Sequence, residues 1–289
     1  MSPAQKELQR TFFRGAIQFQ IIFKGAARFD GPSALEGINL KNNPGTVRAF
    51  CLSAMLFVCT ACAAQERCST EVKLLLSPAE IPAAVGTLKA QAEPSGNVYF
   101  FDTERRDLLA QGVIVRLRRG SSRDLTVKLR PPQEKNFEDP TNGREDFKCE
   151  VDVAANETNI SYSIRNSFTG LQIPETGNDI YRAFSEGQRK LLSAAQVIID
   201  WNSVKRVADI EVTDWQIKLD SRSRKFTLEL WKWPEGKILE LSTKAGIESG
   251  SAAYAELRQV ALDKDLKLSA DQRSKTRMVL ESHAKAVAH

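Results

Sequence analysis

The stretch STEVKLLL at residues 69–76 alternates polar or charged side chains with apolar ones. Successive side chains on a β-strand point to opposite faces, so Ser69, Glu71 and Lys73 share one face and the apolar residues between them share the other. The pattern predicts a strand with one apolar face and one face that bears charges of both signs.

Four later stretches repeat this pattern: VIVRLRR (113–119), LTVKLR (125–130), FKCEVDV (147–153) and KILELSTK (237–244). An antiparallel sheet with one solvated face would explain any one of them. Closing the sheet would instead gather Lys and Arg around a lumen, with carboxylates beside them. A chain of phosphates requires that combination, because cations bind its non-bridging oxygens and carboxylates hold Mg²⁺ or Mn²⁺.

The remaining pattern predicts a mixed α+β domain over residues 65–289. Further strands are expected at 97–102, 196–206, 208–219 and 225–233. Helices are expected at 78–92, 181–195, 251–262 and 270–286. Turn-prone segments rich in Pro and Gly separate these elements.

The composition is typical of a globular protein, since 42% of the 289 residues are hydrophobic and 27% are charged. This excludes a collagen, a low-complexity polymer and a multi-span membrane protein. The formal net charge is +5, but residues 1–64 hold seven basic and three acidic side chains. The other 225 residues carry 34 basic and 33 acidic groups. This balance argues against a nucleic-acid partner.

The stretch AFCLSAMLFVCTACAA at residues 49–64 has no charged residue and follows Arg48. It is shorter than the roughly 20 residues that span a bilayer, so no stable transmembrane span is expected. The pattern predicts a signal peptide at about 47–64, with a true start near Val47. A lipid anchor at Cys62 and a buried N-terminal helix are the alternatives. We therefore expect an exported protein, periplasmic or extracellular.

The predicted body, 65–289, retains two of the five cysteines, Cys68 and Cys149. Export to an oxidising compartment would permit a disulfide between them. Neither cysteine has a metal-ligand spacing, and the two histidines, His283 and His289, lie in the tail. The sequence thus disfavours a zinc site and catalysis by a Ser–His or Cys–His pair.

The order of the charged strands resembles a known family. STEVKLLL is followed by YFFDT (99–103), VRLRR, LTVKL, EVD, ILELSTK and a late SKT at 274–276. This order is similar to that of the CYTH domain, the triphosphate tunnel enzymes, which include inorganic triphosphatases, thiamine triphosphatases and class IV adenylate cyclases. The resemblance covers about residues 70–276 and implies a mostly antiparallel β-barrel of tunnel type with flanking helices.

The resemblance also implies roles for the matching residues. The implied catalytic residues are Glu71, Lys73 and Lys128. Phosphate binding is implied for Lys73, Arg116, Arg118, Lys128, Arg206 and Lys275. The implied ligands of Mg²⁺ or Mn²⁺ are Glu71, Glu150, Asp152 and Glu240.

Two positions depart from the family pattern. Ser69 and Ser242 stand where the family commonly has Glu, so the site loses up to two negative metal ligands. The leading hypothesis is metal-dependent hydrolysis of triphosphate or a short polyphosphate. The alternatives are a non-catalytic exported module that binds a polyanion and, less favoured, an adenylate cyclase. The oligomeric state stays open.

Overall fold

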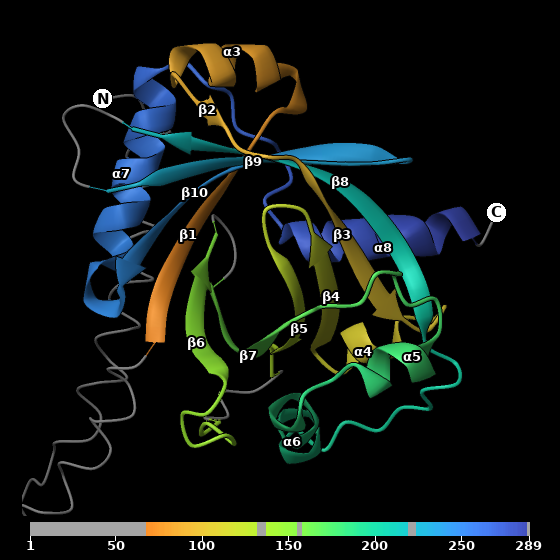
Figure 1. Ribbon diagram of the computed structural model, residues 1–289. Helices are drawn as coiled ribbons and strands as arrows, with labels where there is room; N and C mark the ends of the chain where they lie inside the picture. The colour runs from red at the N-terminus through yellow and green to blue at the C-terminus, as the bar shows by residue number, and fades with distance from the viewer. Residues whose placement is uncertain (1–67, 132–136, 155–157, 219–223, 288–289) are drawn as a thin grey trace, which may run out of the picture. The chain divides into compact units, whose positions relative to one another are not determined.

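The computed structural model describes residues 68–131, 137–154, 158–218 and 224–287 (Figure 1). They all belong to the second of two units of the chain, Ala61–His289. The predicted leader at 1–64, with its start near Val47, its signal peptide and Cys62, lies outside the described residues.

Nine strands close into a barrel in the order β8-β3-β4-β5-β7-β6-β1-β10-β9, because β9 also pairs with β8. β1 and β6 run parallel, and the other pairs of described strands are antiparallel. The expected α+β, mostly antiparallel barrel is thereby confirmed. The strands are β1 (Cys68–Leu76), β3 (Gly96–Asp102), β4 (Val113–Arg119), β5 (Arg123–Leu129), β6 (Asp146–Val153), β7 (Thr158–Ser167), β8 (Lys205–Ile217), β9 (Phe226–Trp233) and β10 (Gly236–Gly246), with a short β2 (Gln91–Ala92) added to β8.

Most helices cover the apolar outer faces of the strands, but the C-terminal helix packs on the lumen side, where its Val279 and Leu280 join Phe100, Trp231 and Ile238. The helical segments are η2 (Pro78–Glu80), α3 (Ile81–Thr87), α4 (Asp107–Ala110), α5 (Gly177–Arg182), α6 (Glu186–Ala194), η3 (Ile247–Ser249), α7 (Gly250–Asp263) and α8 (Lys275–Val287). α7 packs against β1 and β10 and α8 against β8 (Figure 1). Among the described residues, no helix has the length and apolar character to cross a bilayer.

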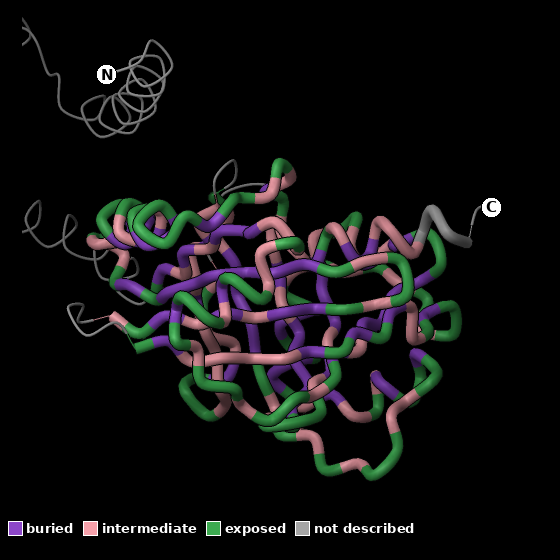
Figure 2. The backbone as a smooth tube through the Cα atoms, turned by 90° about the horizontal axis from the view of Figure 1, so that it is seen from above, coloured by how far each residue is buried: buried purple, intermediate pink, exposed green. Residues whose placement is uncertain are grey.

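The outer faces bury the apolar half of each alternating strand. Val72 and Leu74 of β1 pack with Leu257 of α7 in one cluster, and Val115 of β4 packs with Leu191 of α6 in another. Buried positions follow the strands, whereas exposed positions gather in the connections (Figure 2). Full burial of each such side chain contributes about 1.5–3 kcal/mol, so the alternation predicted from sequence determines which face turns inward.

The disulfide that the sequence left open is present. Cys68 of β1 and Cys149 of β6 are bonded, with Cα atoms 4.5 Å apart. The two residues lie directly opposite each other in the parallel β1–β6 pair. The bond therefore joins two strands that carry charged residues.

One predicted strand differs from the structure, and one observed strand was not predicted. The strand expected at 196–206 does not form, because the backbone N–H groups of Asn202 and Ser203 bond to Asp200 and fold 200–203 into a turn. β8 begins only at Lys205. β7 was not predicted, although Ile160, Tyr162 and Ile164 alternate with polar residues as a strand requires.

Two helix predictions differ from the structure: one helix ends earlier than expected, and the other is divided into two. The helix expected at 78–92 ends at Thr87, and the chain turns at Lys89, whose φ is 48°. The helix expected at 181–195 is two helices. Ser185 caps the second, since its hydroxyl accepts from the backbone N–H of Gln188 while the Gln188 side chain bonds back.

Candidate functional site

Strand pairing places the predicted charged faces inside the barrel. Lys73 of β1 lies opposite Ser242 of β10, and Arg116 of β4 lies opposite Thr126 of β5. Cross-strand partners point to the same side of a sheet. The predicted site residues that the lumen gathers are Glu71, Lys73, Arg116, Arg118, Lys128, Glu150, Asp152, Glu240 and Lys275.

Asp152 of β6 is the carboxylate on which several lumen cations converge. Lys73 Nζ donates to its Oδ1 at 2.7 Å. Its Oδ2 accepts from Lys128 Nζ at 3.0 Å, from Arg130 Nη2 at 3.3 Å and from Ser161 Oγ at 3.4 Å. Burial would raise the pKa of Asp152, but these cations outweigh burial and hold it well below its usual range. Asp152 is therefore ionised at neutral pH.

Glu71 and Lys73 form a second, partly buried ion pair within β1. Lys73 Nζ lies 2.8 Å from Glu71 Oε2. Burial would raise the pKa of Glu71, but Lys73 outweighs it and the pKa falls to about 2. The pKa of Lys73 rises despite burial, because Glu71 and Asp152 stabilise its charge. Both groups are charged at neutral pH.

Lys275, the first residue of α8, reaches the lumen from the far end of the chain. Its Nζ contacts Glu229, donates to Glu240 Oε1 at 2.8 Å and lies 4.6 Å from the ring centroid of Trp231. Burial raises the pKa of Glu240 to about 7 and lowers the pKa of Lys275 well below its usual value. Glu240 therefore changes its charge near neutral pH.

Arg116 and Arg118 of β4 are lumen cations whose guanidinium groups find few acceptors within the protein. The buried Nε atom of each lacks a hydrogen-bond partner in the described part of the chain. Arg118 lies 4.0 Å from the nearest oxygen of Asp124. Burial, followed by repulsion from Arg118, lowers the pKa of Arg116 to about 9. An anion bound between them would supply the missing acceptors.

Arg206 lies outside the lumen, against expectation. A β-bulge at Phe100/Phe101 shifts the register between β3 and β8 and sets Arg206 opposite Phe101. Phe101 belongs to the apolar cluster on the outer face. Arg206 pairs there with Glu175 at 3.0 Å and Asp209 at 3.3 Å. The structure therefore removes Arg206 from the predicted phosphate-binding set.

The acidic residues expected to hold Mg²⁺ or Mn²⁺ do not form a metal site. In residues 68–131, 137–154, 158–218 and 224–287, no group of three or more His, Cys, Asp or Glu side chains is placed to hold a metal ion. Each expected ligand contacts a lysine instead, as Glu150 does with Lys128 at 3.6 Å and Lys244 at 3.6 Å. Carboxylates engaged in this way do not fit a divalent cation.

Several lumen residues were not among the predicted site residues, and Arg130, Glu229 and Asp214 are examples. Arg130 bonds Asp152 and also Ser274 Oγ at 3.2 Å, and it shares the Lys128 face of LTVKLR. Glu229 lies opposite Asp214 in the β8–β9 pair, and burial raises the pKa of Asp214. The period-2 alternation in FTLELWKW, the sequence of β9, would have placed Glu229 on the polar face. In β8, no sequence pattern distinguished Asp214 from the polar residues next to it.

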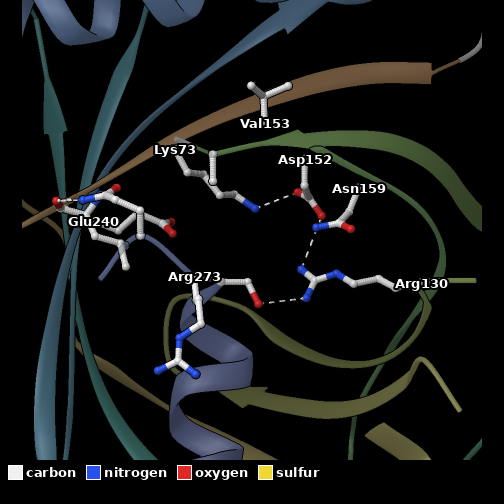
Figure 3. Close-up of a pocket in the computed structure, with 11 residues that line it drawn as sticks. Lys73, Arg130, Asp152, Val153, Asn159, Glu240 and Arg273 are labelled. Carbon is white, nitrogen blue, oxygen red and sulfur yellow. Dashed lines mark hydrogen bonds and ion pairs between the residues drawn. The ribbon is translucent and has the colours of Figure 1, made fainter. Parts of the chain in front are cut away.

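A small cavity opens beside these ion pairs, with room for only about one water molecule while the ion pairs are formed. Lys73 and Arg130 point toward Asp152 from different sides, with Glu240 farther along the wall (Figure 3). Gln272 and Ser274, which precede α8, complete the lining.

Comparison with solved structures identifies the fold. HpAC1 from Hippeastrum, a candidate adenylyl cyclase with a dominant triphosphatase activity, matches with a TM-score of 0.54 and 13% identity, over 73% of this chain and 95% of HpAC1. A candidate adenylate cyclase from Bacillus halodurans matches with a TM-score of 0.48 and 11% identity, over 73% of this chain and 97% of its own. No family model and no curated protein matches the sequence. The likeness to HpAC1 confirms a barrel of the CYTH, or triphosphate tunnel, fold.

Proposed function

We propose that the barrel binds triphosphate or a short polyphosphate in its lumen and hydrolyses it. The observation that carries this proposal is the pair Arg116 and Arg118, whose buried Nε atoms lack partners among the described residues. Leaving a buried charged donor without an acceptor is costly. Phosphate oxygens are suited to a guanidinium, because the planar fork donates two parallel hydrogen bonds.

The neighbouring lysines extend the proposed site along the lumen. Lys73 and Lys128 approach from β1 and β5, and both lie within 3.0 Å of Asp152 oxygens. Lys275 enters from α8. Phosphoryl transfer places negative charge on the oxygens of the transferred group, and preorganised cations stabilise that charge. In this proposal Lys73 and Lys128 serve both binding and catalysis.

The proposed proton acceptor for the attacking water is Glu240. Its pKa of about 7 suits a general base near neutral pH, and its side chain lines the cavity. The pKa of Glu71, about 2, makes this carboxylate a weaker base. Its role in the proposal is to orient Lys73, to which it is bound.

Metal dependence is a separate part of the hypothesis. The resemblance implies Mg²⁺ or Mn²⁺, but the four expected ligands contact lysines. The lumen cations can neutralise phosphate charge directly. We therefore expect the protein to bind tripolyphosphate in the presence of EDTA.

A non-catalytic polyanion-binding module is the second candidate. It is favoured by Ser69 and Ser242, which place hydroxyls where a carboxylate would add to a metal site, and by the ion-paired state of the remaining acids. Such a module would bind tripolyphosphate tightly and release no phosphate.

One set of assays separates these candidates. The full chain is incubated with tripolyphosphate in Mg²⁺, in Mn²⁺ and in EDTA, and released phosphate and ligand binding are both measured. Release above that of the Lys73→Met variant supports hydrolysis, whereas binding without release supports the module. Absence of binding in a folded protein refutes the site. Cyclic AMP formed from ATP would instead identify a cyclase.

We also propose that the protein is exported to an oxidising compartment. The disulfide between Cys68 and Cys149 supports this, because such bonds persist outside the reducing cytosol. Fractionation of the native host, with N-terminal sequencing of the recovered protein, tests both the location and the cleavage near residue 64. A reduced cytosolic protein that retains Ser2 would contradict the proposal.

A further inference from the structure

Asp152 occupies a nest formed by three cations. Lys73 and Lys128 donate to different oxygens of the carboxylate at 2.7 and 3.0 Å, and Arg130 adds a third charge at 3.3 Å. Ser161 Oγ donates a fourth hydrogen bond at 3.4 Å. Four donors thus surround the carboxylate of Asp152, and Lys73 and Lys128 also contact Glu71 and Glu150 at 2.8 and 3.6 Å.

The nest forms part of the wall of the small cavity. Lys73, Arg130 and Asp152 all line the cavity, and Figure 3 shows their polar ends directed toward one another. Arg130 also donates to Ser274 Oγ at 3.2 Å, which helps to fix its guanidinium beside Asp152. A phosphate can reach these donors only by displacing Asp152, because the cavity has room for only about one water molecule.

Displacement of Asp152 depends on the charge of the incoming group. A terminal phosphate carries about −1.5 to −2 at pH 7 and offers three acceptor oxygens. A phosphate inside a chain or ring is a diester-like group with one charge and two free oxygens, which equals the carboxylate. A terminal phosphate should therefore bind the three cations more strongly than Asp152 does, whereas an internal phosphate should not.

We propose that the Lys73–Lys128–Arg130 nest is the subsite for a terminal phosphate, and that Asp152 is its resident anion and selects chain ends against internal phosphates. This inference rests on the proposed function, because it assumes that the lumen binds a polyphosphate. Asp152 thereby acts in specificity rather than as a metal ligand. Arg130 becomes a ligand-binding residue.

Linear tripolyphosphate and cyclic trimetaphosphate provide the test, since both contain three phosphates but the ring has no terminal group. Binding of each to the full chain and to Asp152→Asn is measured by calorimetry in EDTA. We expect the native protein to bind the linear anion about tenfold or more tightly than the cyclic anion. Asp152→Asn should bind both anions more tightly and lose most of the preference.

Asp209→Asn is the matched control, because Asp209 pairs with Arg206 outside the lumen and its loss changes the net charge equally. It should leave both affinities unchanged. If Asp152→Asn is unstable, the shift in its melting temperature with each anion replaces calorimetry. The linear anion should then raise the melting temperature of Asp152→Asn more than that of the full chain.

The outcomes separate the two levels of the proposal. If the full chain binds tripolyphosphate but Asp152→Asn binds it equally or more weakly, the inference is overturned and the proposed function stands. An unchanged linear-to-cyclic ratio in Asp152→Asn also overturns it. If neither protein binds either anion, the proposed function fails and the inference fails with it.

Discussion

Cys149 of β6 is bonded to Cys68 of β1 three register steps from the place where Asp152 lies opposite Glu71. The bond thus joins the two strands whose side chains form the Asp152–Lys73 pair at 2.7 Å. Parallel strands need a long connection, and the cysteines are 81 residues apart in sequence. A cross-link over such a distance restricts the unfolded chain strongly.

Reduction should therefore destabilise the barrel. We expect dithiothreitol, or the Cys68→Ser/Cys149→Ser double variant, to lower the free energy of unfolding by about 2–4 kcal/mol. Urea unfolding followed by tryptophan fluorescence measures the change. The double variant is the control for reductant, because its stability should not respond to dithiothreitol. Equal stability of the oxidised and reduced proteins would contradict this.

Arg116→Ala should weaken tripolyphosphate binding by roughly 10- to 100-fold, which is the range for loss of hydrogen bonds to a charged group. Arg206→Ala is the matched control. It removes the same side chain from the outer face of the barrel, where Arg206 pairs with Glu175, so affinity should not change. Calorimetry in EDTA gives both constants. Equal losses in the two variants would show that only net charge matters.

The buried Glu240 should make stability fall as pH rises toward neutrality. Its pKa is raised from 4.5 to about 7, so between these values the folded protein retains a proton that the unfolded chain has released. The stability is present below pH 4.5 and is lost through pH 7. Relative to Glu240→Gln, the native protein should lose at most about 3 kcal/mol over this window.

Urea unfolding at a series of pH values between 4.5 and 8 checks this expectation. Glu240→Gln keeps Glu229 as a partner for Lys275, so its stability should vary less with pH. Glu211→Gln, an exposed position on β8, should follow the native protein. Parallel curves for the native protein and Glu240→Gln would refute the role assigned to burial.

Restoring carboxylates at Ser69 and Ser242 should create a metal site. Ser242 shares the lumen face with Glu240 and lies opposite Lys73, so a Glu there adds an acidic ligand beside an existing one. We expect the Ser69→Glu/Ser242→Glu variant to bind Mn²⁺ detectably by electron paramagnetic resonance and the native protein to bind it more weakly. The Ser69→Gln/Ser242→Gln variant controls for size. Equal Mn²⁺ binding by all three proteins would contradict the expectation.

The sequence by itself determined the faces of the strands. Alternation in STEVKLLL and in the four later stretches separated Glu71 and Lys73 from Val72 and Leu74, and the structure places these groups on opposite sides of β1. A period of two is a local property of extended backbone, so it can be read without knowing the partners of a strand. The same reasoning would have found β7, since Ile160 and Tyr162 follow it.

Tertiary structure decided which charges meet and which leave the lumen. Asp152 meets Lys73 because β1 and β6 pair in parallel, with a register that strand sequence does not encode. Arg206 turns outward because a single bulge between β3 and β8 reverses the faces beyond it. Pairing, closure and bulges depend on contacts between distant segments. The sequence thus determined the alternation, and the closed barrel decided the ion pairs that this alternation makes.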